Sequence, residues 1–307
     1  MATVKHYLSL VTFSHTIFAM PFAMIGFTLG VMNKTHMQWN LHSMVGWGGG
    51  ITNFILLNTI AVKLPLVILC MIFARSAAMA FNRYLDKNFD ALNPRTAIRE
   101  IPAGIISANK ALLFTAINAV LFIACTWFIN PVCFYLSPIA LLVVLGYSFT
   151  KRFTPLCHLV LGLGLSLAPI GAYLAVTGYF SVLPVLFSLA VIFWVSGFDI
   201  IYALQDEDFD RVHRLYSIPA WLGKKNALSV SSFLHLLSAV SVVIAGIYGG
   251  FNILYWAGAL VFGGMLIYQH SIVNATDISR VNRAFMTANG IASVVFAVFV
   301  ISDRLIF

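Results

Sequence analysis

Charged side chains are scarce in this sequence: Asp, Glu, Lys and Arg make up 9% of its 307 residues, against about 25% in ordinary soluble domains. A chain that is 61% hydrophobic cannot cover a soluble globule with polar surface. Cysteine is also rare, and the four cysteines show no metal-ligand spacing. No basic patch is interleaved with aromatic residues, so the net charge of +8 does not indicate nucleic-acid binding. The sequence therefore predicts an integral membrane protein.

Long apolar runs predict where the chain crosses the membrane. Windows of about 20 apolar residues match the thickness of the hydrocarbon core. The segment 40–60 is only half apolar, and its run of three glycines, Gly48 to Gly50, favours an interfacial or re-entrant piece. Nine spans are predicted, at about 8–32, 60–82, 108–129, 132–150, 156–179, 182–204, 226–248, 252–271 and 285–303.

The basic residues predict the orientation of these spans, because cytoplasmic loops carry an excess of Lys and Arg. With nine spans, most basic residues fall on one side of the membrane, together with the amino terminus. The opposite side has only Lys34, Lys63 and Arg304. We therefore expect the amino terminus and the charged segments to face the cytoplasm.

Eight of the ten carboxylates lie in two segments, 75–104 and 199–210. Steps of seven and four residues return to nearly the same face of a helix, so the first segment forms one polar stripe. The second segment repeats these steps, and each acidic cluster is followed by Ile-Pro-Ala, at 101–103 and again at 218–220. We interpret the pair as an internal duplication in which two helices present acidic faces to a shared cavity. The two stripes are Arg75, Asn82, Asp86 and Asp90, and Asp199, Asp206, Asp210 and Arg214.

A single acidic stripe at a membrane boundary is ordinarily a solvated helix end. Two matched stripes favour a functional site, because carboxylates and an amide are hard oxygen ligands that suit Mg²⁺ completed by substrate phosphates. The loop 93–104, with Arg95 and Arg99, is expected to close over a phosphate as a lid. Membrane acids can also line the path of a cation transporter, but the neighbouring Arg and Lys residues would block such a path.

Three further features lie inside or beside the predicted spans. His15 interrupts the first span, where a lone His ordinarily bonds a neighbouring helix and alternatively faces the acceptor substrate. Lys151 and Arg152 end the fourth span, and such a pair is ordinarily a topology signal. The small residues of span 156–179 predict close helix packing, and Pro169 predicts a kink that opens an internal cavity.

With these residues in hand, the chain resembles the UbiA superfamily of intramembrane prenyltransferases. The pattern Asn82-x-x-x-Asp86-x-x-x-Asp90 resembles the first aspartate-rich motif of that family, and Asp199-x-x-Tyr202-Ala203-x-x-Asp206-x-x-x-Asp210 resembles the second. Arg95-Thr96, Arg99 and residues 101–104 resemble the basic run after the first motif, and residues 147–154 resemble the piece after the fourth helix. The resemblance covers about residues 10–225 and is closest to the 4-hydroxybenzoate polyprenyltransferase branch.

The resemblance implies an all-α membrane fold of nine transmembrane helices around a central cavity, built as two four-helix pseudo-repeats plus a final helix. The chain would be one domain, with halves at about 8–150 and 151–271 and the last helix at 285–303. The implied reaction transfers a polyprenyl group from a prenyl diphosphate to an aromatic acid of the 4-hydroxybenzoate type, in ubiquinone biosynthesis at the bacterial cytoplasmic membrane. No protein partner is implied.

Two departures from the family pattern leave the acceptor open. Arg83 stands after Asn82 where the family commonly has Asp, and Ser14-His15-Thr16 stands where many hydroxybenzoate enzymes have an acidic-basic-Pro pattern. Another aromatic acceptor in menaquinone biosynthesis, of the futalosine or naphthoate type, is the alternative.

The resemblance also implies the roles of individual residues. Two Mg²⁺ ions would be held by Asn82, Asp86, Asp90, Asp206 and Asp210. The catalytic groups would be Asp86, Asp90, Asp206, Asp210 and Arg152. The substrates would contact Arg75, Lys87, Arg95, Arg99, Lys151, Asp199, Tyr202 and His15.

Overall fold

The computed structural model of the chain describes residues 3–11, 18–45 and 50–307. Within these ranges the regular structure is entirely helical, which confirms the predicted all-α fold. The α-helices are α1 (Val4–Leu10), α2 (Met20–Val45), α3 (Gly50–Leu92), α4 (Ala108–Ile129), α5 (Pro131–Thr150), α6 (Cys157–Thr177), α7 (Val182–Ala203), α8 (Glu207–Val212), α9 (Ile218–Gly249), α10 (Ile253–Ile272) and α11 (Asn289–Ile306). A 3₁₀ turn, η2 (Leu204–Asp206), precedes α8, and a π-helical turn, η3 (Arg283–Ala288), precedes α11.

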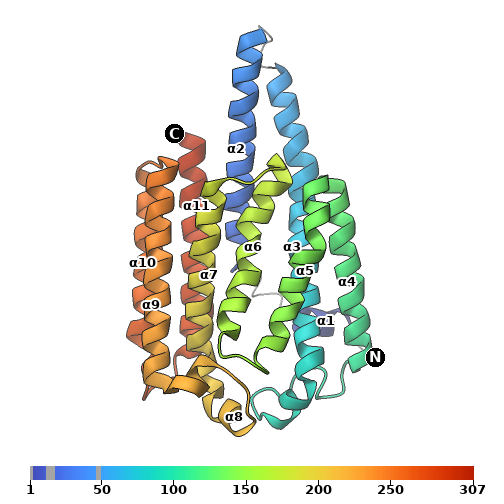
Figure 1. Ribbon diagram of the computed structural model, residues 1–307, viewed down its shortest axis with the longest axis vertical. Helices are drawn as coiled ribbons and strands as arrows, with labels where there is room; N and C mark the ends of the chain where they lie inside the picture. Colours follow the sequence, from blue (N-terminus) through green and yellow to red (C-terminus); the bar gives the residue numbers. More distant parts are fainter. Residues whose placement is uncertain (1–2, 12–17, 46–49) are drawn as a thin grey trace.

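The helices form a bundle of a multi-pass membrane protein (Figure 1). In the described part of the chain, seven segments are long and apolar enough to cross a membrane. Two further long helices, α2 and α10, lie alongside them in the bundle. The count of nine spans stays a prediction, as does the division of the chain into two halves. The seven segments are Leu57–Leu92, Ala108–Ile129, Pro131–Thr150, Cys157–Thr177, Val182–Val212, Ile218–Gly249 and Arg283–Ile306.

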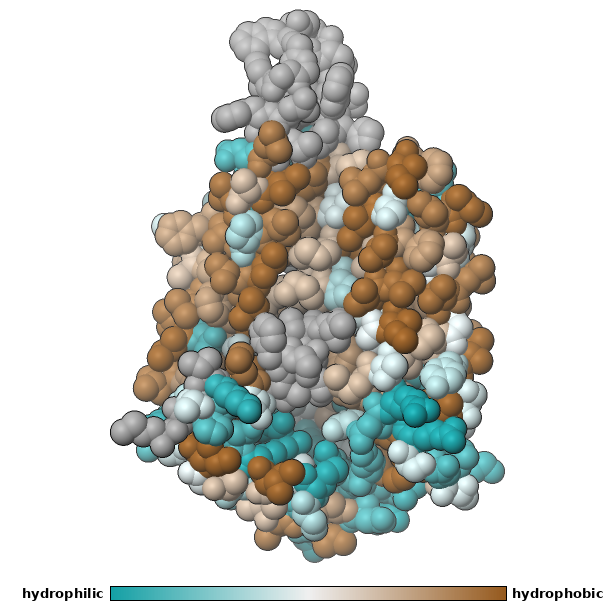
Figure 2. Space-filling view, turned by 180° about the vertical axis from the view of Figure 1, so that it is seen from behind, coloured by the Kyte–Doolittle hydropathy of each residue, from teal (hydrophilic) through white to brown (hydrophobic). Residues whose placement is uncertain are grey.

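Polar side chains gather at one end of the bundle, and a broad hydrophobic belt covers the helices above it (Figure 2). We call this the charged end. It contains the four connections 93–107, 151–156, 204–217 and 273–282. Helix α1 lies at the charged end, and α11 ends at the opposite end (Figure 1).

The structure corrects the prediction for the first two spans and for the segment between them. Helix α2 begins at Met20, with Pro21 in its first turn, where a missing backbone N–H costs no hydrogen bond. The expected interfacial piece at 40–60 is instead the end of α2 and the beginning of α3, and both extend past the other helices (Figure 1). A helix can continue beyond the hydrocarbon layer because its backbone hydrogen bonds are internal. Residues 46–49 lie outside the described ranges.

An aromatic core joins α2, α7, α10 and α11. Trp194 lies between Phe22 and Phe262, with ring centroids 5.3 and 5.8 Å away. Phe296 packs on Phe262 at 5.3 Å and on Phe22 at 6.0 Å. Such tilted aromatic contacts add to the energy of burying the rings. The core therefore fixes one side of the bundle.

Small residues let α6 approach two neighbours, as the sequence predicted. A side chain at Gly162 would meet the Ile192 carbonyl oxygen of α7 at 2.6 Å. A side chain at Gly26 of α2 would overlap the backbone of α6 at Pro169. Close backbone approach of this kind is typical of helix pairs in membranes.

Candidate active site

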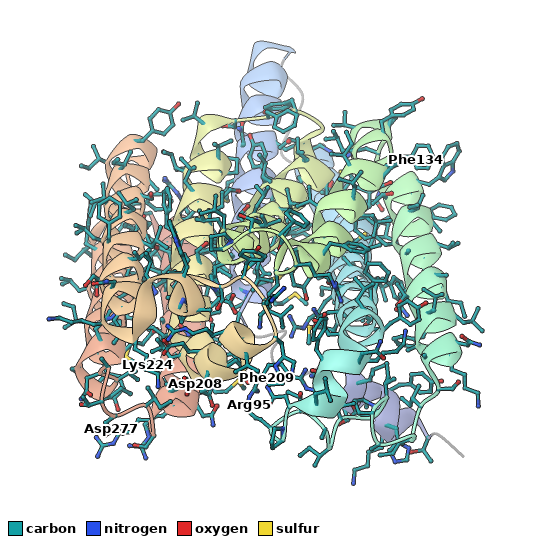
Figure 3. All side chains as sticks on the ribbon, turned by 60° about the horizontal axis from the view of Figure 1, so that its bottom comes forward. Arg95, Phe134, Asp208, Phe209, Lys224 and Asp277 are labelled. Carbon is teal, nitrogen blue, oxygen red and sulfur yellow. The ribbon has the colours of Figure 1, made fainter. Side chains whose placement is uncertain are left out.

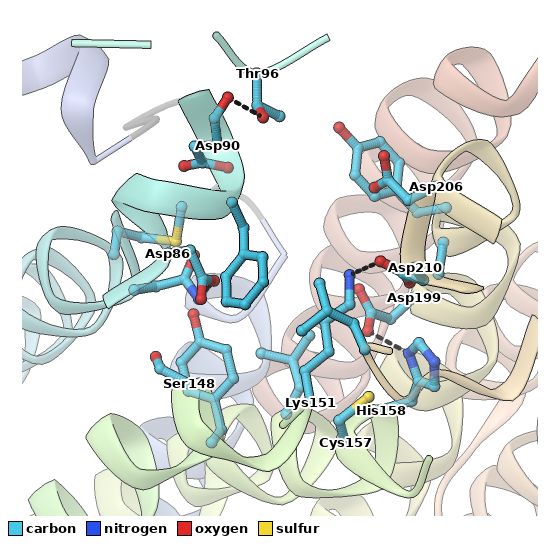
Figure 4. Close-up of a pocket in the computed structure, with 18 of the residues that line it drawn as sticks. Asp86, Asp90, Thr96, Ser148, Lys151, Cys157, His158, Asp199, Asp206 and Asp210 are labelled. Carbon is cyan, nitrogen blue, oxygen red and sulfur yellow. Dashed lines mark hydrogen bonds and ion pairs between the residues drawn. The ribbon is translucent and has the colours of Figure 1, made fainter. Parts of the chain in front are cut away.

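A cavity of about 470 Å³ opens at the charged end between the two acidic segments (Figure 4). Asp86 and Asp90 of α3 lie on one side of it, and Asp199, Asp206 and Asp210 lie on the other (Figure 4). Residues of α5, α6 and the connection between them line the cavity below. The structure thus brings the two predicted acidic segments to one shared cavity.

The first acidic stripe lies on a continuous helix, as predicted, because α3 extends to Leu92. Asn82 Nδ2 donates a hydrogen bond to Asp86 Oδ2 at 3.0 Å, one helical turn apart. Asp86 Oδ1 also accepts from Arg152 at 3.0 Å. One turn further on, Asp90 Oδ1 accepts from Arg99 at 2.6 Å. Arg152, expected first as a topology signal, is therefore part of the site.

The second acidic stripe does not lie on one continuous helix, which corrects the prediction. Helix α7 ends at Ala203, so Asp199 lies on α7, Asp206 ends the 3₁₀ turn and Asp210 lies on α8. The tighter turn changes the direction of the chain and carries Asp206 towards the loop after α3. Asp206 there pairs with Arg95, at 2.5 Å. A search for apolar windows cannot detect this break, because it measures hydrophobicity and the break is a change from one type of helix to another.

The loop after α3 reaches across the cavity to the second acidic segment. In addition to the Arg95 pair, Asn93 Nδ2 donates to Asp206 Oδ1 at 3.1 Å, and Arg95 donates to the Tyr202 hydroxyl at 3.3 Å. Arg95 and Phe209 of α8 lie together where this loop meets α8 (Figure 3). The loop occupies the position expected of a lid, while its movement stays a prediction.

Carboxylate partners keep two of the cavity's cations, Lys151 and Arg95, in their charged form. Lys151 Nζ lies 2.7 Å from Oδ1 of Asp210, a fully buried carboxylate that also accepts from Ser217 at 2.9 Å. Burial alone would lower the pKa of Lys151, but the Asp210 carboxylate raises it above the ordinary value. Burial would likewise lower the pKa of Arg95, but the Asp206 carboxylate raises it above the ordinary value. Both groups therefore stay positively charged at neutral pH.

Asp199 has a different partner, which the sequence did not reveal. His158, at the first turn of α6, places Nδ1 2.7 Å from Asp199 Oδ2. His158 Nε2 lies 3.3 Å from the backbone N–H of Ile218, at the start of α9. Because Nε2 accepts that hydrogen bond, Nδ1 carries the proton that is donated to Asp199. A sequence motif could not show this contact, because its partners are 41 residues apart.

The structure places most other predicted residues in the cavity, but not all. Arg75 and Tyr202 line it, as does Arg83, the departure from the family pattern. Lys87 does not line it: its ammonium lies 4.2 Å from the ring centroid of Tyr84, on another face of α3. Arg214 is exposed and does not line the cavity either. His15 lies outside the described residues.

The donor set of the cavity fits Mg²⁺ only together with a substrate. All the candidate ligands are hard oxygens, and Asp90 Oδ2 is a buried oxygen with no hydrogen-bond partner among the described residues. Within the same part of the chain, no three His, Cys, Asp or Glu side chains are grouped to hold a metal by themselves. This agrees with Mg²⁺, which is ordinarily held by one or two carboxylates, waters and substrate phosphates.

Comparison with known proteins identifies relatives of the chain. The model of the UbiA prenyltransferase family matches residues 43–291. A 4-hydroxybenzoate octaprenyltransferase of Tolumonas auensis is 33% identical over 223 residues, which is 73% of this chain and 78% of the relative. A protein of the same name from Nitrosomonas europaea is 32% identical and covers 76% of this chain and 80% of its own length.

Solved structures share the fold. An apo UbiA homologue from Aeropyrum pernix superimposes with a TM-score of 0.78 at 29% identity and covers 94% of this chain and 98% of its own. A UbiA homologue from Archaeoglobus fulgidus, bound to DMAPP and Mg²⁺, has a TM-score of 0.72 at 18% identity, with coverage of 98% and 99%. Both match over nearly the whole bundle.

Proposed function

The chain belongs to the UbiA prenyltransferase family, and from this membership we propose that it transfers a polyprenyl group from a prenyl diphosphate to an aromatic acid of the 4-hydroxybenzoate type. One observation carries the proposal. Aspartates from both halves of the chain face a single cavity, and four of them are paired there with Arg or Lys. The names of the bacterial relatives support 4-hydroxybenzoate as the acceptor.

The diphosphate of the donor would bind between the two acidic segments. Asp86 and Asp90 with Asn82 would hold one Mg²⁺, and Asp206 and Asp210 a second. When bound, the metal ions would stabilise the negative charge that develops on the departing diphosphate. Arg95, Arg99, Lys151 and Arg152 would donate hydrogen bonds to diphosphate oxygens, exchanging their carboxylate partners for phosphate. These four cations would act together, because each of their ion pairs joins two different segments that line the cavity.

The acceptor would lie deeper than the diphosphate. Arg75 is seven residues before Asn82 on the same face of α3, about 10 Å further from the charged end at 1.5 Å per residue. Its guanidinium is suited to the carboxylate of an aromatic acid. Asp199 is the cavity aspartate held by a histidine, so its carboxylate is placed to receive a proton from the acceptor.

The reaction follows from this placement. The allylic C–O bond of the donor breaks, with its electron pair leaving on the diphosphate, and a ring carbon of the acceptor forms the new C–C bond. The proton of that ring carbon passes to Asp199. Apolar groups such as Phe18, Leu161 and Phe198 also line the cavity and would help to exclude water, which would otherwise capture the allylic cation.

Charge distribution supports a cytoplasmic location of the site. The basic residues of the connections lie at the charged end with the cavity, and such residues ordinarily stay in the cytoplasm. The cation-transporter alternative is disfavoured by the family and by the six Arg and Lys side chains that line the cavity, which would repel a passing cation.

Mass spectrometry of reaction products tests the proposal. Purified protein is incubated with Mg²⁺, octaprenyl diphosphate and a panel of aromatic acids that includes 4-hydroxybenzoate and naphthoates. We expect a prenylated 4-hydroxybenzoate, and turnover should disappear in excess chelator. Asp86→Ala and Asp206→Ala should each lower turnover at least about a hundredfold, about 3 kcal/mol of transition-state stabilisation.

The double variant should lose far less than the sum of the two single losses, because the two acidic segments act on one diphosphate. Gel filtration is the folding control for all variants. A product on another aromatic acid alone would move the proposal to the alternative acceptor. Near-parental turnover of either single variant, or full turnover in chelator, would falsify the two-metal site.

A further inference from the structure

A buried polar network joins α7, α10 and α11 outside the active-site cavity. Asn289, the first residue of α11, is fully buried, and so are Trp194 of α7 and Gln269 of α10. Asn289 Oδ1 accepts hydrogen bonds from Trp194 Nε1 at 2.9 Å and from Gln269 Nε2 at 2.8 Å. Because an indole N–H can only donate, the contact with Trp194 fixes which end of the Asn289 amide is the oxygen. The amide nitrogen therefore points to other partners.

These partners are two carbonyls of the π-helical turn η3. Asn289 Nδ2 donates to the Phe285 carbonyl at 2.9 Å and to the Ala284 carbonyl at 3.3 Å. The backbone N–H of Asn289 donates to Met286, so the side chain supplies a donor to two carbonyls that lie further back in the turn. Turns of the π type are rare, and they frequently occur at functional sites. Asn289 thus holds an unusual turn at the start of α11.

The turn places the ring of Phe285 in the wall of the active-site cavity. The Phe285 ring centroid lies 4.3 Å from that of Tyr202, with the two planes 34° apart. Phe18 and Phe198 pack on Phe285 edge to face, at 5.3 and 5.4 Å. Each residue of a regular α-helix advances by about 100°, so loss of the extra residue in the turn would direct Phe285 to another face. The π-helical turn therefore decides whether Phe285 contacts Tyr202.

Tyr202 connects Phe285 to the loop after α3. The Tyr202 hydroxyl accepts a hydrogen bond from Arg95 at 3.3 Å, and the central guanidinium carbon of Arg95 lies 5.6 Å from the Tyr202 ring centroid. Arg95 is also the cation that pairs with Asp206, at 2.5 Å. The contact with Phe285 restricts the Tyr202 ring, and a fixed ring keeps its hydroxyl where Arg95 can donate to it.

The polar network lowers the stability of the core in which it lies. Gln269 Oε1 is buried and has no hydrogen-bond partner among the described residues. A buried acceptor without a donor is unfavourable, whereas an apolar side chain of the same shape would carry no such penalty. Natural proteins ordinarily keep a local conflict of this kind where it serves a functional geometry. The network is therefore a candidate for more than packing.

We propose that Asn289 is a positioning residue for the diphosphate donor. Its amide holds the turn that keeps Phe285 on Tyr202, and Tyr202 in turn holds Arg95 at the position of the diphosphate. Asn289 does not line the cavity, so it acts through Phe285. The inference rests on the proposed function, in which Arg95 donates to the diphosphate. A network that served only stability would, when removed, lower the melting temperature and leave the affinity for the donor unchanged.

Binding of an unreactive donor analogue gives the first test. The Kd of a prenyl thiodiphosphate is measured by calorimetry in detergent with Mg²⁺, and the KM of the aromatic acid is measured separately. We expect Asn289→Ala and Phe285→Leu each to raise the Kd at least about fivefold, with the KM of the acid within about twofold of the parent. Ser293→Ala is the matched control, since Ser293 is equally buried on α11 and its hydroxyl donates to Gly290 of its own helix. It should bind the analogue as the parent does.

Combined variants show whether these residues act in series. If Asn289 acts through Phe285, the double variant should bind the analogue within about twofold of the weaker single variant, while its melting temperature falls below that of both. By the same reasoning, Phe285→Leu should not weaken binding further in a protein that already carries Arg95→Ala. Losses of affinity that multiply in either combination would overturn the inference.

Parental affinity for the analogue in either single variant would also overturn it. Phe285→Leu leaves the bonds of Asn289 in place, so this variant decides even if Asn289→Ala does not fold. In these outcomes the parent still prenylates its acceptor and the proposed function is unaffected. Failure of the parent to use any prenyl diphosphate would instead sink the proposed function.

Discussion

Asp199 differs from the other aspartates of the cavity in the chemistry of its partner. Asp86, Asp90, Asp206 and Asp210 each face Arg or Lys, whereas Asp199 faces His158. The imidazole is only 3% exposed and is held at both nitrogens. A buried histidine held in this way fixes the orientation of the carboxylate beside it. We therefore expect His158 to position Asp199 for the acceptor.

Replacement of His158 should affect the chemical step more than donor binding. We expect His158→Ala to lower kcat at least about tenfold, about 1.4 kcal/mol, with the KM of the prenyl diphosphate within about twofold of the parent. His158→Gln should retain more activity, because an amide can still donate to Asp199. Steady-state kinetics with each substrate varied in turn provide the measurement. A loss confined to the donor KM, or equal losses in both variants, would contradict a positioning role.

Single residues also show the limit of reasoning from sequence. The motif aspartates and their arginines could be found because charge is so rare in this chain that each cluster is conspicuous. His158 could not, since nothing near it in the sequence predicts a contact with α7 and α9. Lys87 shows the opposite error: it is adjacent to Asp86 in sequence, but consecutive helical residues point about 100° apart, and its side chain lies on Tyr84.

At the scale of helices, the end of α11 secures the turn between α9 and α10. Asn252, the N-cap of α10, makes no side-chain cap of its own. Asp303 of α11 replaces it: its carboxylate accepts from the backbone N–H groups of Asn252 at 2.9 Å and Tyr255 at 3.2 Å. Arg304 donates to the Gly249 carbonyl at the end of α9. A negative group thus faces a helix N-terminus and a positive group a helix C-terminus, which favours both ends.

Loss of the Asp303 carboxylate should destabilise the bundle without changing the chemistry. Asp303→Ala leaves the buried backbone N–H of Tyr255 and the partly buried N–H of Asn252 without an acceptor, and we expect it to cost about 2–4 kcal/mol. Asp303→Asn keeps one acceptor oxygen and should cost less. Thermal unfolding in detergent gives the comparison. Asp277→Ala is the control, because Asp277 is an exposed residue of the connection 273–282. This variant should unfold at the same temperature as the parent. An Asp303→Ala protein as stable as the parent would refute the capping role.

Helix positions were predictable where the apolar run and the helix coincide. The expected span 108–129 matches α4, and 132–150 and 182–204 match α5 and α7 within a residue. The expected span 60–82 is too short, because apolar windows report the hydrocarbon layer and α3 continues into water with polar side chains. Asp86 and Asp90 lie in that continuation of α3. The charged residues therefore predicted this end of the helix, where the apolar window did not.

At the scale of the whole molecule, two properties follow from one uneven distribution of charge. The connections at the charged end hold most of the cations on which the predicted orientation depends, and four of these cations, Arg95, Arg99, Lys151 and Arg152, also line the cavity. The opposite end contains α2 and α3 beyond the bundle, with Lys63 donating to the Ala175 carbonyl at the end of α6, at 2.7 Å. The positions of Lys and Arg in the sequence predicted this difference between the two ends. They could not predict which apolar helices contact one another, because that depends on long-range packing.

The count of spans decides on which side each connection lies. Helix α10 joins Gly250, at the end opposite to the site, to Asn274, at the charged end. If α2 and α10 both cross, reporter proteins fused after Asn93 and Asn274 should behave as cytoplasmic, and those after Gly250 and Phe307 as external. A fluorescent protein that matures only in the cytoplasm and a phosphatase active only outside it give complementary signals at each position. If α10 did not cross, Gly250 and Asn274 would report the same side and the Phe307 fusion would become cytoplasmic. Nine spans with a cytoplasmic site therefore require the alternation of all four fusions, because each crossing helix reverses the side of the chain that follows it.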